Sequence, residues 1–238
     1  MAQSQLRTSR YTIPALPPDL LRRQRLLDFL YENIHRKLNL ICATAGYGKS
    51  SLVIDFVHDT DYPVAWCRLI EADSDLAQLA NSLATALQVA FPGMLSTLPQ
   101  VAAQRGITPD ELAAAWVHEI ETSLADYFIL VLDDFHLIQD SPSIKRFFDV
   151  LLTSLPEQAH LLIVGRIIPP LRFTALAARQ EIAGLSEEHL RFTADEVQQF
   201  IALRNGLRLS TAEAEQLVAG TEGRITGILL TTHLMWQA

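Results

Sequence analysis

The sequence predicts an α/β fold: a parallel five-stranded sheet in a three-layer sandwich with helices, followed by a small helical subdomain. Two apolar runs, 127–134 and 160–166, are continuous until charged residues end them, as expected of strands buried on both faces. A third apolar run, 38–42, leads through the glycine-rich turn 43–50 into the helix-like segment 51–57. Strand, glycine-rich loop and helix in this order are typical of α/β sheets that bind ligands at the carboxyl ends of their strands.

The other elements follow from periodicity, prolines and capping signals. Residues 1–19 are polar and then proline-punctuated, which predicts an extended lead-in. Asp19 is the expected N-cap of a helix over 20–34. Further helices are expected at 73–90, 108–124, 143–154, 194–204 and 210–219, with a final helix to Trp236; the remaining strands are expected at 62–69 and about 188–192, the latter after a short helix, and 92–107 as irregular or weakly helical. Capping boxes open three of these helices, at Thr108, Thr193 and Ser210.

The chain therefore divides into the lead-in 1–19, a sheet domain 20–192 and a helical subdomain 193–238, which we expect to continue beyond the residues given. A hydrophobic content of 49% and a charged fraction of 19% exclude a disordered chain. The net charge of −8 argues against a nucleic-acid-binding surface.

No stretch has the apolar core of a signal peptide or the length of a membrane span, so we expect a cytoplasmic protein that does not contact a membrane. Cys42 and Cys67 fall in apolar runs and predict no disulfide. The seven histidines lack ligand spacing, so no metal site made by protein ligands alone is expected.

The turn 43–50 is the strongest functional signal. Gly46 and Gly48 allow backbone amides to surround a polyphosphate, and the following helix directs its free N–H groups at the same anion. Lys49 can reach the β- and γ-phosphates, and the Ser50 hydroxyl can bind Mg²⁺. Ala43 stands where the full motif has its first glycine. The alternative is an ordinary glycine-rich turn before a core helix.

Two adjacent carboxylates, Asp133 and Asp134, end the apolar run 127–134. Because strand alternation points them in opposite directions, we expect different roles: Asp133 as a Mg²⁺ ligand, and Asp134 as the group that positions or deprotonates an attacking water. Arg166 ends the next apolar run and should reach the same edge of the sheet, where it can stabilise charge on a γ-phosphate. The alternatives are a turn-capping carboxylate pair and a surface arginine.

A basic cluster, Arg22, Arg23 and Arg25, lies on the first predicted helix. It could approach a phosphate or a base, but its spacing alone favours a solvated helix face.

Taken together, these segments resemble the nucleotide-binding domain of STAND NTPases, and among them the subfamily of the maltose-regulon transcriptional activator and its large LuxR-type relatives. The resemblance extends from about Arg23 to Ile228. The segments that carry it are 45–52, 64–66, 130–138, 165–166 with 169–171, 190–196 and 221–223.

The resemblance implies a P-loop NTPase fold of the ASCE or AAA-like type and a switch that binds ATP or ADP with Mg²⁺. It implies slow ATP hydrolysis, a closed ADP state, and self-association of a larger regulatory protein, a transcriptional one, in the ATP state. The implied nucleotide-binding residues are Gly46, Tyr47, Gly48, Lys49, Ser50, Ser51, Arg23 and Arg224; Asp134 and Arg166 are catalytic, and Ser50 and Asp133 bind the metal.

One segment departs from the family pattern. Ile225 stands where relatives carry a proline that touches the nucleotide, so either Arg224 or Ile225 is the expected contact there. Two other functions remain open from the sequence: a small-molecule kinase with a P-loop, and a nucleotide-dependent scaffold without significant turnover. Two features favour the switch. One is Arg166, and the other is an additional strand between the strand that precedes the loop (38–42) and the strand that ends in the two carboxylates (127–134).

Overall fold

The computed structural model describes residues 9–235 of the 238-residue chain. Five parallel strands form one sheet: β1 (Leu38–Cys42), β2 (Val64–Arg68), β3 (Phe128–Asp133), β4 (Ala159–Gly165) and β5 (Ile182–Leu185). Their order is β2-β3-β4-β1-β5. The predicted parallel five-stranded sheet is therefore confirmed, and β4 is the strand inserted between the loop strand β1 and the acidic strand β3.

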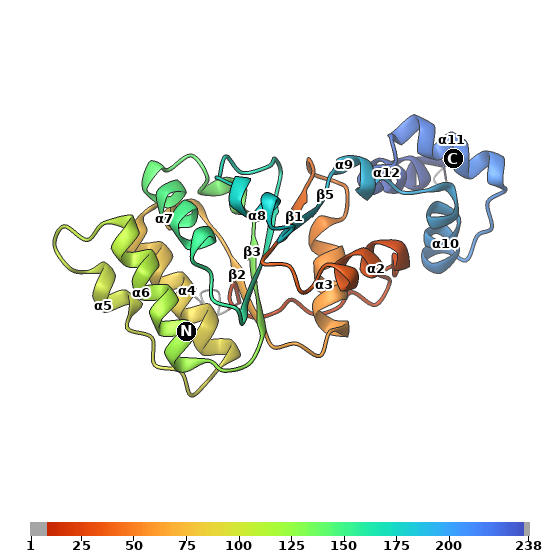
Figure 1. Ribbon diagram of the computed structural model, residues 1–238. Helices are drawn as coiled ribbons and strands as arrows, with labels where there is room; N and C mark the ends of the chain where they lie inside the picture. The colour runs from red at the N-terminus through yellow and green to blue at the C-terminus, as the bar shows by residue number, and fades with distance from the viewer. Residues whose placement is uncertain (1–8, 236–238) are drawn as a thin grey trace.

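Helices cover both faces of the sheet (Figure 1). One face carries α4 (Leu76–Ala90), α5 (Leu98–Ala102), α6 (Pro109–Ser123), α7 (Pro142–Thr153) and α8 (Thr174–Ala178); the other carries α2 (Gln24–Glu32) and α3 (Lys49–Asp59). Along β3, Leu130 and Leu132 face the first layer, whereas Ile129 and Val131 face the second. This alternation explains why the whole strand is apolar.

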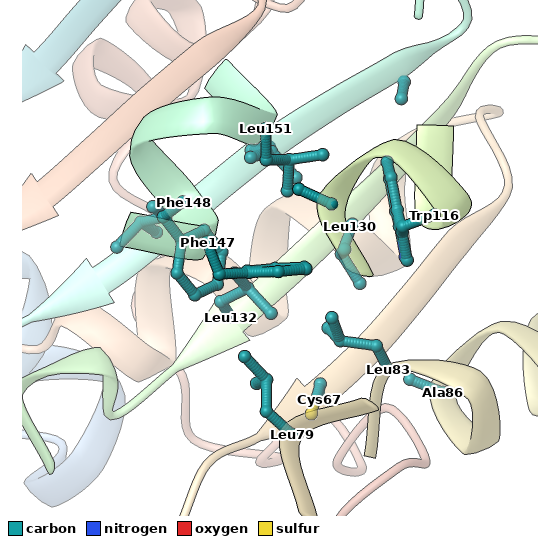
Figure 2. Close-up of a cluster of buried hydrophobic side chains, with 14 of the residues drawn as sticks. Cys67, Leu79, Leu83, Ala86, Trp116, Leu130, Leu132, Phe147, Phe148 and Leu151 are labelled. Carbon is teal, nitrogen blue, oxygen red and sulfur yellow. The ribbon is translucent and has the colours of Figure 1, made fainter. Parts of the chain in front are cut away.

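The larger apolar core lies between the sheet and helices α4, α6 and α7. Figure 2 shows Leu130 and Leu132 of β3 close to Trp116, Phe147 and other large side chains from these helices. The core fixes the plane of the sheet and so the positions of the strand ends at which β1, β3 and β4 present polar residues.

A smaller unit follows the sheet, made of α9 (Glu187–Leu190), α10 (Ala194–Asn205), α11 (Thr211–Thr221) and α12 (Ile225–Met235). It lies at one end of the molecule, next to the α2/α3 layer (Figure 1). Phe192, Val197 and Ile201 are among its buried residues, and Leu21, which precedes α2, packs against this cluster. Among residues 9–235, no helix is long and apolar enough to cross a membrane.

Two predicted elements differ from the structure. The last strand was expected at about 188–192, but β5 is Ile182–Leu185 and residues 187–190 form α9. The strand was missed because Gly184 interrupts its apolar pattern; an added Cβ there would lie 3.2 Å from the Leu40 carbonyl oxygen, so the close approach of β1 requires a small residue. Ser186 and His189 form a capping box that starts a helix instead.

The first helix was expected over 20–34 with Asp19 as its N-cap, but it begins at Gln24. Asp19 instead forms an ion pair with Arg204 of α10, with 3.1 Å between Oδ2 and Nη1. The lead-in is fixed by Arg10, whose guanidinium binds Asp73 and whose carbonyl accepts a hydrogen bond from the Arg68 amide at 2.8 Å. The predicted end of the last helix, Trp236, lies outside the described residues. Two short 3₁₀ turns, Glu71–Ser74 and Phe135–Leu137, complete the description.

Candidate functional site

The loop between β1 and α3 has the backbone of a phosphate cradle. Gly46 and Gly48 have φ values of +95° and +76°, which L side chains rarely adopt. Gly48 is the N-cap of α3 and provides no side-chain hydrogen bond, so the first N–H groups of α3 lack that partner. A Cβ added to Gly48 would meet nothing within 4 Å, so the space beside the loop is open. These features fit a bound polyphosphate.

Lys49 is the first residue of α3, and its Nζ donates to the Thr44 carbonyl oxygen at 3.0 Å, across the loop. Burial lowers the pKa of Lys49, and the charges of Asp133, Arg166 and Asp134 act on it as well. The three groups predicted to meet Lys49 are thus close enough to influence its charge. Ser50 is exposed, and Ser51 lines a cavity described below.

Asp133 and Asp134 have different environments, but not through strand alternation, because β3 ends at Asp133 and Asp134 lies beyond the strand. Asp133 is 5% exposed, and its Oδ1 accepts the Asp134 amide at 3.0 Å. Burial, reinforced by the charge of Asp134, raises the pKa of Asp133 to about 6. Asp134 has a left-handed backbone, with φ 60° and ψ 33°, and its Oδ2 accepts a hydrogen bond from Arg68 Nε at 3.0 Å.

Arg166 follows β4 directly and is exposed. Because β4 lies between β1 and β3, Arg166 reaches the same edge of the sheet as the loop and the two carboxylates. The structure thus brings Lys49, Asp133, Asp134 and Arg166 together at the carboxyl ends of three adjacent strands.

His136 is a polar residue of this site that the sequence reasoning missed. It lies in the 3₁₀ turn after Asp134, and both its ring nitrogens are buried with no hydrogen-bond partner. Burial lowers its pKa, and the charge of Arg166 lowers it further. An unsatisfied imidazole beside Lys49 and Arg166 is a ready partner for a ligand oxygen. The available signal was a histidine two residues after the acidic pair, which a search for metal-ligand spacing does not detect.

A cavity of about 220 Å³ adjoins the phosphate loop. The sheet domain contributes Gly48, Ser51 and Leu52 to it. A third sheet-domain residue of α3, Asp55, also lines it, and the rest of the lining comes from the segment before α2 and from residues 192–229: Pro17, Asp19, Leu20, Leu21, Arg23, Phe192, Phe200, Arg204, Ile225 and Leu229. The cavity therefore lies between parts of the chain that are far apart in sequence, and it has mainly apolar walls suited to a planar base.

Arg23 lines this cavity, but its guanidinium is held by protein groups. It is 5% exposed and donates to the carbonyl oxygens of Leu190 and Arg191 at 3.0 and 2.8 Å. It also binds Glu196 at 2.9 Å. The interpretation of the basic cluster as a solvated helix face is thus wrong for Arg23, because its charge joins α2 to the helical subdomain.

Tyr47 and Arg224 contact each other. Tyr47 is fully buried and donates its hydroxyl to Glu187 at 3.0 Å. Arg224 Nε donates to the same hydroxyl at 2.9 Å, and its guanidinium lies 5.2 Å from the ring centroid. Ile225, in contrast, lines the cavity. Of the two candidates for contact with the nucleotide, Ile225 is therefore the one that lines the cavity.

The start of α12 also contacts the loop. Thr226 follows Ile225, and its amide donates to the Gly46 carbonyl oxygen at 3.5 Å. A Cβ on Gly46 would approach Thr226 Oγ1 to 2.3 Å. The helical subdomain thus packs directly on the phosphate loop, through a glycine that leaves room for it.

Comparisons with known proteins agree with this geometry. No protein-family model matches the chain. The HTH-type transcriptional regulators MalT of Yersinia enterocolitica and Yersinia pestis are 29% and 28% identical to it over 227 residues, or 93% of this chain. The match covers 24% of each relative, so the chain spans about a quarter of the length of the curated relatives it matches.

Among solved structures, a Signal Transduction ATPase with Numerous Domains (STAND) protein with a tetratricopeptide repeat sensor, from Pyrococcus horikoshii, aligns with a TM-score of 0.63 and 18% identity. This alignment covers 91% of this chain and 30% of that one. A Walker-type ATPase of Pyrococcus abyssi aligns with a TM-score of 0.55 and 14% identity, over 89% of this chain and 67% of that one. The predicted resemblance is therefore confirmed: the chain is similar in sequence to the MalT regulators, and its fold is that of the STAND P-loop ATPases.

Proposed function

We propose that this chain is the nucleotide-binding switch of a larger, transcription-regulating protein. It binds ATP or ADP with Mg²⁺, hydrolyses ATP slowly, and controls self-association through the nucleotide it holds. One observation carries the proposal: the cavity beside the phosphate loop is walled jointly by the sheet domain and the helical subdomain. A ligand there contacts both, so it biases their arrangement by its different affinity for each arrangement.

In this proposal the loop holds the phosphates of the nucleotide, and the cavity beside it holds the base. The amides of Gly46, Gly48 and the first turn of α3 bind phosphate oxygens, with Lys49 as the counter-charge and Ser51 at the junction with the base cavity. Ile225 and Leu229 supply apolar contact for the base. Ser50 and Asp133 are the residues that would hold Mg²⁺, and the ion would offset the negative charge of the phosphates.

Hydrolysis needs a base for the attacking water and a cation for the charge that develops on the phosphoryl group. Asp134 is the base, since it is the partly exposed carboxylate of the pair. Arg166 is the cation, with His136 as a hydrogen-bond donor to the same oxygens. The position of the cavity favours a switch over a small-molecule kinase, because it extends on the base side of the loop toward the helical subdomain.

The Asp134→Ala substitution separates the switch from a scaffold without turnover. We expect the variant to bind Mg²⁺·ATP as the parent does and to lose hydrolysis by about 100-fold or more, in the range for loss of a general base. Single-turnover assays with excess protein measure the chemical step directly. Equal single-turnover rates in parent and variant would remove Asp134 from the mechanism.

Self-association is tested by static light scattering of the chain with ADP and with a non-hydrolysable ATP analogue. The proposal expects a higher mass with the analogue. An identical mass with both nucleotides would show that any self-association of the larger protein is not driven by this domain alone.

A further inference from the structure

Arg68 is a charged residue at the edge of the site, and none of the roles proposed above involves it. It is the last residue of the outermost strand β2, and it pairs in register with Asp133. Its Nε donates to Asp134 Oδ2 at 3.0 Å. This contact connects a residue of the sheet edge to the carboxylate proposed as the base.

The direction of this contact matters. In the order β2-β3-β4-β1, the phosphate loop follows β1, two strands from β3 on one side, whereas Arg68 is on the strand at the other side. Adjacent strands are about 4.8 Å apart, so the end of β1 lies about 10 Å from that of β3. The ion pair therefore draws the Asp134 carboxylate toward the sheet edge and away from the loop.

Backbone hydrogen bonds fix Arg68 itself and join the residues next to the two partners. The Arg68 amide donates to the Arg10 carbonyl oxygen at 2.8 Å, and the Leu69 amide donates to the Asp133 carbonyl oxygen at 2.9 Å. Asp134 itself has a left-handed backbone that non-glycine residues seldom adopt, a form of strain that is concentrated at functional sites. The side chains, by contrast, are 63% and 30% exposed, so the pair between them is weak and can open.

We propose that Arg68 is a positioning residue that holds the Asp134 carboxylate away from the phosphate loop and so restrains ATP hydrolysis. This rests on the proposed function, in which Asp134 is the base. An open ion pair frees the carboxylate to turn toward a bound nucleotide. Because the Arg68–Asp134 ion pair is exposed and weak, the carboxylate is free for part of the time. Hydrolysis is therefore slowed but not blocked.

The Arg68→Gln substitution removes the charge while keeping a polar side chain at the edge of β2. We expect kcat for ATP to rise roughly two- to fivefold, the population change for an exposed pair worth up to about 1 kcal/mol. The affinity for Mg²⁺·ATP should not change, and Arg68→Lys should restore the parent rate. In an Asp134→Ala background, Arg68→Gln should give no gain.

Arg146→Gln is the matched control, since Arg146 forms an equally exposed pair with Asp110 between α7 and α6. It should leave kcat unchanged. A fall in kcat for Arg68→Gln, an unchanged kcat, or a gain that persists without Asp134 would overturn the proposal. Failure of the parent to bind Mg²⁺·ATP would instead refute the proposed function.

A second readout needs no nucleotide. The Arg68 Nε–Hε resonance of the nucleotide-free protein should shift upfield in Asp134→Asn, because the charge-assisted hydrogen bond is lost, and should not move in Asp110→Asn. An Arg68 resonance that does not respond to Asp134→Asn would show that the pair does not hold in solution, and the restraint would be excluded.

Discussion

Gly46 carries two constraints at once: its φ of +95° and the contact of Thr226 with the position of its missing Cβ. The Gly46→Ala substitution should therefore cost more than backbone strain alone. Gly106→Ala is the matched control, with φ +77° and open space around the added Cβ, and should cost about 1–2 kcal/mol in free energy of unfolding. We expect Gly46→Ala to lower the free energy of unfolding by more than that value, as measured by urea denaturation.

The additional loss of stability in Gly46→Ala, relative to Gly106→Ala, reports the contact between the loop and α12. Thr226→Ala removes the hydroxyl and methyl groups that a Cβ on Gly46 would meet. In the Thr226→Ala background, Gly46→Ala should therefore cost no more than Gly106→Ala does. If the cost of Gly46→Ala is the same in both backgrounds, α12 does not rest on the loop in solution.

At the scale of elements, Glu196 joins the helical subdomain to the first helix. Its carboxylate accepts the Thr193 amide in the capping box of α10 and also binds Arg23 and Arg25. Burial raises the pKa of Glu196, but the hydrogen bonds from Arg23 and Arg25 outweigh it, and the net pKa lies below its ordinary value. The folded state thus favours the ionised carboxylate.

Glu196→Gln should keep the cap, because glutamine also serves at this position, and lose the ion pairs. We expect a loss of about 2–3 kcal/mol in free energy of unfolding at pH 7, less than for a fully buried pair because Arg25 is partly exposed. Since the folded pKa is depressed, this difference should be constant above pH 4.5 and shrink as the pH falls further. Urea denaturation across this range measures it. A difference that persists unchanged at pH 3, or is absent at pH 7, contradicts the ion-pair role.

The elements that depend on local signals were predicted well from the sequence. The capping boxes at Thr108, Thr193 and Ser210 start helices as expected, because each involves only four consecutive residues. β5 was placed wrongly because the reason for Gly184 lies in another strand: the close approach of β1 leaves little room for a side chain there. A constraint imposed from a distant strand leaves no local pattern to read.

At the scale of the whole molecule, the sequence predicted the meeting of Lys49, Asp133 and Arg166 because the carboxyl ends of parallel strands share one edge. It did not predict the contacts that join the helical subdomain to the loop. The hydrogen bonds of Tyr47 to Glu187 and to Arg224 span 140 and 177 residues. Such contacts depend on how two separately packed units meet. The hydrophobic periodicity of either unit does not predict which residues will face the other.

Nucleotide binding at the loop underlies every role proposed for this site. Calorimetric titration of Mg²⁺·ATP and Mg²⁺·ADP into the parent chain and into Lys49→Ala tests it most directly, with Lys145→Ala of α7 as a control for loss of a lysine. We predict that parent and control bind both nucleotides, and that Lys49→Ala weakens binding by at least about 100-fold, since hydrogen bonds from a charged group to phosphate are lost. Unchanged affinity in Lys49→Ala, or no binding by the parent, would contradict the assignment of the loop as the phosphate site.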